Sequence, residues 1–359
     1  MTPLAELLVR RIAAGGPITL ADYMADCLLH PDHGYYATRD PLGRRGDFTT
    51  APEISQMFGE LLGLSLGQAW LDQGAPAPFV LAEIGPGRGT LMADVLRTIR
   101  AVPGMAGAAR VHLVEASPAL RARQRETLAG VDVTWHDHIE TLPEAPLFLL
   151  ANEFFDALPI RQFVRAGDGW CERVVGLSAA RSLQPGLAAP APLAALAHRL
   201  ADTRQGDVVE IRPAAPAIAA AIAGRIARHG GAALIVDYGG WRSLGDTFQA
   251  VKGHAVTDPF AEPGEADLTA HVEFEPLAAA ARGAGAAASP MVPQGLLLGR
   301  LGIDARAERL ARGLGGAALE SHLAAYRRLT LPGEMGRVFK AMAIHPRPFS
   351  PPPGFEPSP

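Results

Sequence analysis

Three glycines follow a short apolar run and precede a helical segment. In LAEIGPGRGT they are Gly85, Gly87 and Gly89, and the apolar run contains Glu83. Glycine lets a backbone turn tightly and approach a ligand closely, although a strand-to-helix turn can also be glycine-rich for structural reasons alone. A dinucleotide fingerprint places its third glycine three residues after the second, whereas here the interval is two. The spacing therefore argues against NAD.

An acidic residue follows the next apolar run, VHLV, at the place where a ribose would be recognised. A carboxylate at this point, Glu115, can accept hydrogen bonds from both ribose hydroxyls. A glycine turn together with such an acid is the arrangement of Rossmann-like methyltransferases that use S-adenosylmethionine. We therefore expect this cofactor, held by the glycine turn, Glu83 and Glu115.

Polar residues also follow the third and fourth apolar runs. Asp137 comes after VDVTWH, where it could accept from an adenine amino group, cap a helix or lie in a solvated loop. Asn152, Glu153 and Asp156 follow LFLLA. Open α/β sheets bind ligands at this edge, although Asn152 and Asp156 could instead cap a helix. We predict that these three residues belong to a ligand site, with Asn152 in the cofactor site.

Upstream, the polar stretch GDFTTAPEIS offers Gly46, Asp47 and Thr50 as the parts of a lid over the cofactor. From composition alone this stretch is only a loop that leads into a helix, capped by Thr50 or Ser55. The segment HPDHGYY contains two histidines and an aspartate, but no third neighbouring ligand follows, so we assign no metal.

Elements that position these residues can be recognised from hydrophobic periodicity. We expect a helical and lid region over 1–75 and an α/β core over 76–345, because short apolar runs alternate there with helical stretches. Within the core, 160–206 is expected to be an accessory insertion that begins with a hairpin, and 294–330 a helical addition. The alanine- and proline-rich part of the insertion, 178–206, is expected to be a loop that leads into a short helix, and DVVEIRP after it to be a strand of the core sheet. The proline-rich segment 346–359 is expected to be a flexible tail.

Composition narrows the function further. The 359 residues are 48% hydrophobic and 19% charged, with a net charge of -4 and two cysteines. This excludes wholesale disorder, a disulfide framework and a global field that would attract nucleic acid. With no long apolar stretch and no targeting leader, we expect a bacterial cytoplasmic protein without stable membrane insertion.

Several longer strings resemble the MidA-like methyltransferases, whose mitochondrial members are complex I assembly factors that methylate an arginine. The resemblance runs from about residue 15 to 344, with mild departures at Leu268 and Glu273. The strings are HPDHGYY, GDFTTAPEISQMFGE, EIGPGRGTL, LVEASPALR, ANEFFDALPIRQF, DYG, DLTAHVEF, QGLLLGRLGI and MGRVFKAM. The resemblance implies a Rossmann-like class I methyltransferase with a seven-stranded, mostly parallel sheet. It also implies symmetric arginine dimethylation (type II) of a complex I subunit during assembly.

If the acceptor is arginine, we expect a pair of carboxylates in the active site, because a guanidinium remains protonated and must be oriented for attack on the sulfonium methyl. Our hypothesis is that Glu153 and Asp156 hold the acceptor and that Asp47 orders the lid. His271 and the pair Asp237 and Tyr238 are secondary candidates, each equally well explained as structural.

Two rival functions remain. A non-catalytic assembly or scaffold protein could share this fold, although intact EIGPGRG and NEFFDALP strings favour an enzyme. A nucleotide-dependent oxidoreductase is disfavoured by the position of Gly89. The sequence leaves the identity of the methyl acceptor and the oligomeric state open.

Overall fold

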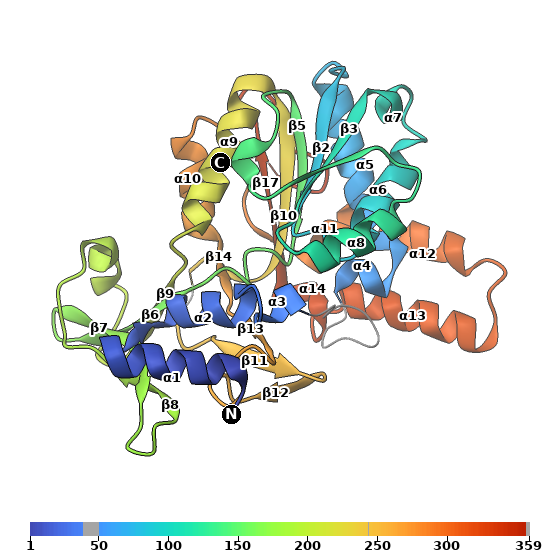
Figure 1. Cartoon of the computed structure of the whole chain (residues 1–359). Coiled ribbons are helices and arrows are strands. Elements are labelled where there is room, and N and C mark those ends of the chain that lie inside the picture. Colours follow the sequence, from blue (N-terminus) through green and yellow to red (C-terminus); the bar gives the residue numbers. More distant parts are fainter. Residues whose placement is uncertain (39–49, 243, 357–359) are drawn as a thin grey trace. The chain divides into compact units, whose positions relative to one another are not determined.

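The computed structural model describes residues 1–38, 50–242 and 244–356 (Figure 1). The chain forms two compact units that are interleaved in the sequence, whereas the expected domains were consecutive stretches. What we call the accessory unit comprises Met1–Phe48, Asp156–Ala215 and Arg242–Glu273, and the core unit comprises Thr49–Phe155, Pro216–Trp241 and Phe274–Pro359. The N-terminal 75 residues are thus divided between both units.

A mainly parallel sheet forms the centre of the core unit, in the order β15-β17-β10-β5-β2-β3-β4. Its parallel strands are β2 (Phe79–Ile84), β3 (Ala109–Val114), β4 (Val133–His136), β5 (Leu147–Asn152) and β10 (Gly231–Gly240). β17 (Phe339–His345) is antiparallel to β10. The apolar runs form buried strands because both faces of the sheet are covered.

The edge beside β17 is made by two short strands, β15 (Ala287–Ala288) and β16 (Val292–Pro293), which both pair with β17. The α/β class is therefore confirmed. The sheet has nine strands in all, seven of which follow one another in this order, so the count of seven stays a prediction.

Helices cover both faces of this sheet. In Figure 1, α9 (Ala215–His229) and α10 (Phe274–Gly283) lie on the left of the sheet, and α5 (Gln56–Asp72) and α6 (Thr90–Ile99) on its right. The remaining helices of the core unit are α4 (Ala51–Ile54), α7 (Met105–Ala108), α8 (Pro118–Thr127), η1 (Ile139–Thr141), α11 (Gln294–Arg300), α12 (Ile303–Ala311), α13 (Gly316–Thr330) and α14 (Met335–Val338).

The accessory unit contains two small sheets and the first helices of the chain. Its sheets have the orders β1-β7-β6-β9, with β8 beside β7, and β12-β11-β13. Its elements are α1 (Pro3–Gly15), β1 (Ile18–Thr19), α2 (Leu20–Leu29), α3 (Tyr35–Thr38), β6 (Arg161–Ala166), β7 (Gly169–Leu177), β8 (Leu183–Leu187), η2 (Ala194–Leu200), β9 (Val208–Ile211), β11 (Gln249–Lys252), β12 (Ala255–Thr257), β13 (Asp267–Thr269) and β14 (Val272–Glu273).

The expected hairpin is confirmed, with Ala166 opposite Gly169 at its turn. Two other expectations were wrong. β9 pairs with β6 in the accessory sheet instead of extending the core sheet, and the segment expected to be a loop contains β8.

The C-terminal segment also differs from the flexible tail that its prolines predicted. Phe355 is buried within the core unit, and the carbonyl oxygen of Pro353 accepts a hydrogen bond of 2.8 Å from Ser65 Oγ. An aromatic anchor thus fixes the described part of this segment, up to residue 356, although proline prevents it from forming a helix. Over the described residues, no helix combines the length and the apolar character needed to span a bilayer.

Candidate functional site

The glycine turn connects β2 to α6, and all three of its glycines have left-handed backbone conformations. The φ angles of Gly85, Gly87 and Gly89 are 64°, 53° and 82°. A Cβ atom added to Gly85 would lie 2.8 Å from Cδ2 of Phe154. Glycine is required here both by conformation and by the close approach of this ring. The turn thus has the geometry that lets backbone atoms face a ligand.

Glu115 follows β3 directly, and its carboxylate is held by two donors. Oε1 accepts from the backbone N–H of Ser117 at 2.8 Å, and Oε2 accepts from Gln124 Nε2 at 3.2 Å. Burial raises the pKa of Glu115 above its ordinary value. The acid therefore has a fixed orientation at the carboxyl end of the sheet. Gln124 could not be predicted from the sequence, because a glutamine on an otherwise charged helix gives no sign of being buried.

Two buried oxygens near the carboxyl ends of the neighbouring strands β2 and β5 lack a hydrogen-bond partner within the described part of the chain. They are Oε2 of Glu83 and Oδ1 of Asn152. Burial raises the pKa of Glu83 well above its ordinary value, and the nearby Glu115 carboxylate adds to this. Buried polar atoms usually have partners, so these two oxygens mark a place where a donor-bearing ligand can bind.

Glu153 has a φ of 50°, in the left-handed region that non-glycine residues seldom adopt. Its backbone N–H donates to the carbonyl oxygen of Val236 at 2.9 Å. Its Oε1 accepts from Asn152 Nδ2 at 3.0 Å and from the backbone N–H of Ala51 at 3.3 Å. Backbone strain of this kind persists where the surroundings fix it, and it is concentrated at functional sites.

Asp156 belongs to the accessory unit, where backbone contacts fix its position. Its carbonyl oxygen accepts from Ala270 N at 3.2 Å and from Arg212 Nη2 at 3.3 Å. The alternative that Asn152 and Asp156 cap a helix is wrong, because β5 leads through a turn into β6.

The predicted lid stretch is described only from Thr50 onward, and Gly46 and Asp47 lie outside the described residues. Thr50 is the N-cap residue of α4 but makes no side-chain capping bond, whereas Ser55 Oγ accepts from the backbone N–H of Met57 at the start of α5. Oε1 of Glu53, in α4, accepts from Thr90 Oγ1 at 2.5 Å. The end of the stretch is therefore attached to the helix that follows the glycine turn.

Asp137 follows β4, where the adenine was expected. Its side chain is 71% exposed and pairs with Arg121 Nη2 at 2.7 Å. On β4 itself, His136 Nε2 lies 2.8 Å from Nδ1 of the buried His112. The role of Asp137 toward adenine stays a prediction.

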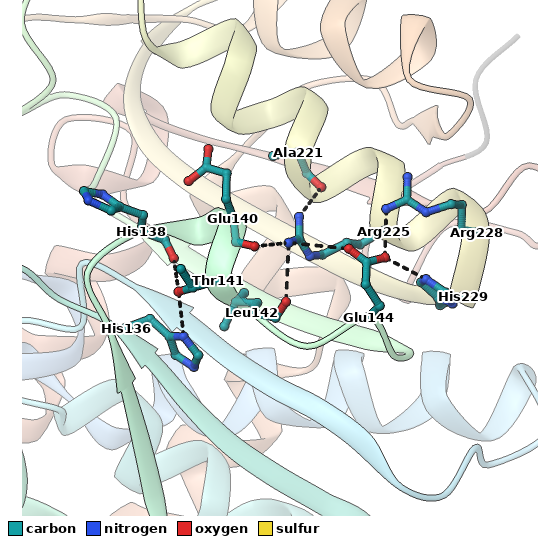
Figure 2. Close-up of polar contacts among 10 residues, drawn as sticks. All are labelled: His136, His138, Glu140, Thr141, Leu142, Glu144, Ala221, Arg225, Arg228 and His229. Atoms are coloured by element: carbon teal, nitrogen blue, oxygen red, sulfur yellow. Dashed lines mark hydrogen bonds and ion pairs between the residues drawn. The ribbon is translucent and has the colours of Figure 1, made fainter.

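The loop beyond β4 is fixed to α9, as Figure 2 shows. Nη2 of the buried Arg225 donates to the carbonyl oxygens of Glu140 at 2.7 Å and Leu142 at 3.4 Å. Glu144 then pairs with Arg228 and His229 of the same helix, each at 2.9 Å. These contacts limit how far the edge of the predicted adenine site can move.

The secondary candidates have structural partners. Both oxygens of the fully buried Asp237 accept backbone N–H groups, Oδ1 from Tyr238 and Oδ2 from Phe155, each at 3.0 Å. The backbone N–H of His271 donates to Thr247 Oγ1 at 2.9 Å. Among the described residues, no group of three or more histidine, cysteine, aspartate or glutamate side chains could hold a metal ion.

A parallel sheet with a glycine turn after one strand and a buried acid after the next defines the class of Rossmann-like nucleoside-binding proteins to which many methyltransferases belong. The chain belongs to the family described as "Putative S-adenosyl-L-methionine-dependent methyltransferase", whose model matches residues 61–292. The predicted family is thereby confirmed, and its cofactor is S-adenosylmethionine, as expected.

Relatives and a solved structure agree with this membership. The mouse and human proteins named "Protein arginine methyltransferase NDUFAF7, mitochondrial" are 38% and 37% identical, with 96% of this chain aligned to 85% and 84% of theirs. A Burkholderia thailandensis protein bound to S-adenosyl-homocysteine is 33% identical, with a TM-score of 0.82 over 95% of this chain and 91% of that one. The mitochondrial relatives contradict the expectation of a bacterial cytoplasmic protein.

The residues present fit the cofactor. Its amino acid part carries an ammonium group, which can donate to the unpartnered oxygens of Glu83 and Asn152. The glycines let the backbone approach that part closely, and Glu115 can receive the ribose hydroxyls.

Proposed function

We propose that this chain is a protein arginine methyltransferase that forms symmetric dimethylarginine. The names of the mouse and human relatives support arginine as the acceptor. The observation that carries the proposal is the strained Glu153, which follows the strand next to β2 and its glycine turn. A carboxylate at that point is the group that a guanidinium acceptor requires.

Bound S-adenosylmethionine supplies an electrophilic methyl group on its sulfonium sulfur. Glu153 would hold the guanidinium by charge-assisted hydrogen bonds and orient one nitrogen toward that methyl group. As the new C–N bond forms and the S–C bond breaks, that nitrogen loses a proton, which a carboxylate can accept. Asp156 is the proposed second acid, and Asp47 is proposed to order the lid.

The proposed acceptor protein is a subunit of respiratory complex I, methylated during assembly. The resemblance to complex I assembly factors supports this, as do the mitochondrial relatives. The seven-stranded arrangement of class I methyltransferases fits the sheet when β15 and β16 are taken as one interrupted edge strand. We further propose that the helical addition near 294–330 covers the core.

Transfer of a labelled methyl group tests this function. The purified chain is incubated with methyl-labelled S-adenosylmethionine and complex I subunits, and the products are hydrolysed and analysed for methylated arginines. We expect symmetric dimethylarginine from the wild type and at least about tenfold slower transfer by Glu153→Gln and Asp156→Asn. Glu126→Gln, on the exposed face of α8, is the matched control.

The acid assignment is wrong if Glu153→Gln and Asp156→Asn both retain wild-type rates while binding the cofactor normally. Cofactor binding without methylation of any arginine would instead favour the non-catalytic scaffold.

A further inference from the structure

Gln124 of α8 is fully buried and contacts three segments at the carboxyl end of the core sheet. Its Nε2 donates to the carbonyl oxygen of Gly87 at 2.8 Å and to Glu115 Oε2 at 3.2 Å. Its Oε1 accepts from Trp135 Nε1 at 2.8 Å. One amide thus joins the glycine turn after β2, the acid after β3 and the strand β4.

The orientation of this amide is fixed by Trp135. An indole N–H can only donate, so the oxygen of Gln124 must face it and the NH₂ group must face the other way. The guanidinium of Arg125 lies 4.7 Å from the centroid of the Trp135 ring and contacts its face. With the oxygen committed to Trp135, the two N–H bonds of Gln124 are directed to Gly87 and Glu115.

Glu115 is the acid expected to receive the ribose. Gln124 restrains its Oε2, and the backbone N–H of Ser117 restrains its Oε1. Each carboxylate oxygen can accept more than one hydrogen bond, so both retain capacity for ribose hydroxyls. A flexible carboxylate would have to be ordered when the cofactor binds, which would lower the affinity.

We propose that Gln124 is a positioning residue for the cofactor, which aligns the Glu115 carboxylate with the ribose and holds the Gly87 carbonyl in the glycine turn. This inference rests on the assignment of the cofactor site. A positioning role differs from a merely structural one because it links Gln124 to one functional group of the ligand, the ribose diol.

The test measures binding of S-adenosylhomocysteine and of its 2′-deoxy analogue by calorimetry. In the wild type, removal of the 2′-hydroxyl should weaken binding about tenfold, because Glu115 loses one hydrogen bond from the ribose. Gln124→Met keeps the length of the side chain but removes its hydrogen bonds. We expect this variant to bind S-adenosylhomocysteine about tenfold or more weakly and to discriminate the two ligands less than about threefold.

Trp135→Phe provides a second variant if Gln124→Met does not fold. It keeps an aromatic ring but removes the N–H that orients the amide, and it should also narrow the difference between the two ligands. Glu126→Gln on the same helix should leave both affinities unchanged.

Wild-type discrimination retained in a folded Gln124→Met or Trp135→Phe variant would overturn the positioning role alone. A wild-type chain that binds neither ligand would overturn this inference together with the cofactor site.

Discussion

The backbone N–H of Phe155 donates to Oδ2 of Asp237 at 3.0 Å, so a buried carboxylate in β10 holds the turn that follows β5. Glu153 lies in that turn and has a left-handed backbone conformation. This side-chain acceptor in the interior therefore helps to maintain a strained segment at the proposed acceptor site.

Replacement of this carboxylate by an amide should destabilise both the fold and the site. In the wild type, two backbone N–H groups each donate to an oxygen of Asp237. In Asp237→Asn, one of them faces the NH₂ group of the amide instead. We expect the free energy of unfolding in urea to fall by about 2 kcal/mol and methyl transfer to slow more than cofactor binding weakens. Asp168→Asn, in the exposed hairpin turn, should change neither quantity. Wild-type stability in Asp237→Asn would contradict the prediction.

Two glycines allow the cost of a left-handed backbone to be measured separately from the cost of a steric clash with the Phe154 ring. Gly85 and Gly130 both have left-handed φ angles, but an added Cβ meets the Phe154 ring only at Gly85 and nothing within 4 Å at Gly130. We expect Gly130→Ala to cost about 1 kcal/mol of stability with unchanged affinity for S-adenosylhomocysteine. Gly85→Ala should cost more and should also weaken binding about tenfold. Equal effects of the two variants, measured by urea unfolding and calorimetry, would show that Phe154 yields easily.

The sequence predicted those parts of the fold that depend on local signals. Apolar runs marked the parallel strands, and spaced glycines marked the turn after β2, because both patterns reflect the environment of their own segment. Burial of Phe355 was not predictable in this way. A proline-rich segment has no periodicity, and only the surface against which it packs shows that it is ordered.

The candidate residues also divide into those marked by a local sequence signal and those that depend on tertiary packing. Glu115 was recognised because it directly follows a strand, but its partner Gln124 could not be, since their contact depends on how α8 packs beside β3 and β4. The assignment of β9 to the core sheet failed for a related reason. Its sequence is that of any short strand, and only pairing with β6 decides to which sheet it belongs.

Acidic pH should weaken the pairing of β3 with β4. Burial lowers the pKa of His112 from 6.5 to about 4, and the neighbouring His136 adds to this shift. The folded state therefore disfavours a proton that the unfolded chain accepts, so the contribution of a neutral His112 is complete above about pH 6.5 and is lost toward about pH 4. We expect the wild type to lose more stability than His112→Asn between about pH 7.5 and about pH 5.

The wild type is compared with His112→Asn because Asp94 also titrates in this pH range and changes the stability in the opposite direction. Burial raises its pKa to about 6, so its ionisation destabilises the folded state as the pH rises. Subtracting the two urea-unfolding curves isolates His112. Parallel curves for the wild type and His112→Asn would show that the histidine takes up its proton without penalty.

Arg212 offers a way to separate acceptor binding from cofactor binding. Its guanidinium donates to four backbone carbonyls of the accessory unit, at 2.9 to 3.3 Å, which belong to Asp156, Leu158, Ala270 and His271. Lysine cannot reproduce this planar set of donors. In Arg212→Lys we expect the segment that bears Asp156 to loosen, so KM for the acceptor protein should rise about tenfold. Affinity for S-adenosylhomocysteine should stay unchanged, because the glycine turn, Glu115 and the other strand-end residues assigned to the cofactor belong to the core unit.

Arg204→Lys, at an exposed position of the accessory unit, is the control. An equal loss of affinity for the acceptor protein and for S-adenosylhomocysteine in Arg212→Lys would indicate general unfolding instead.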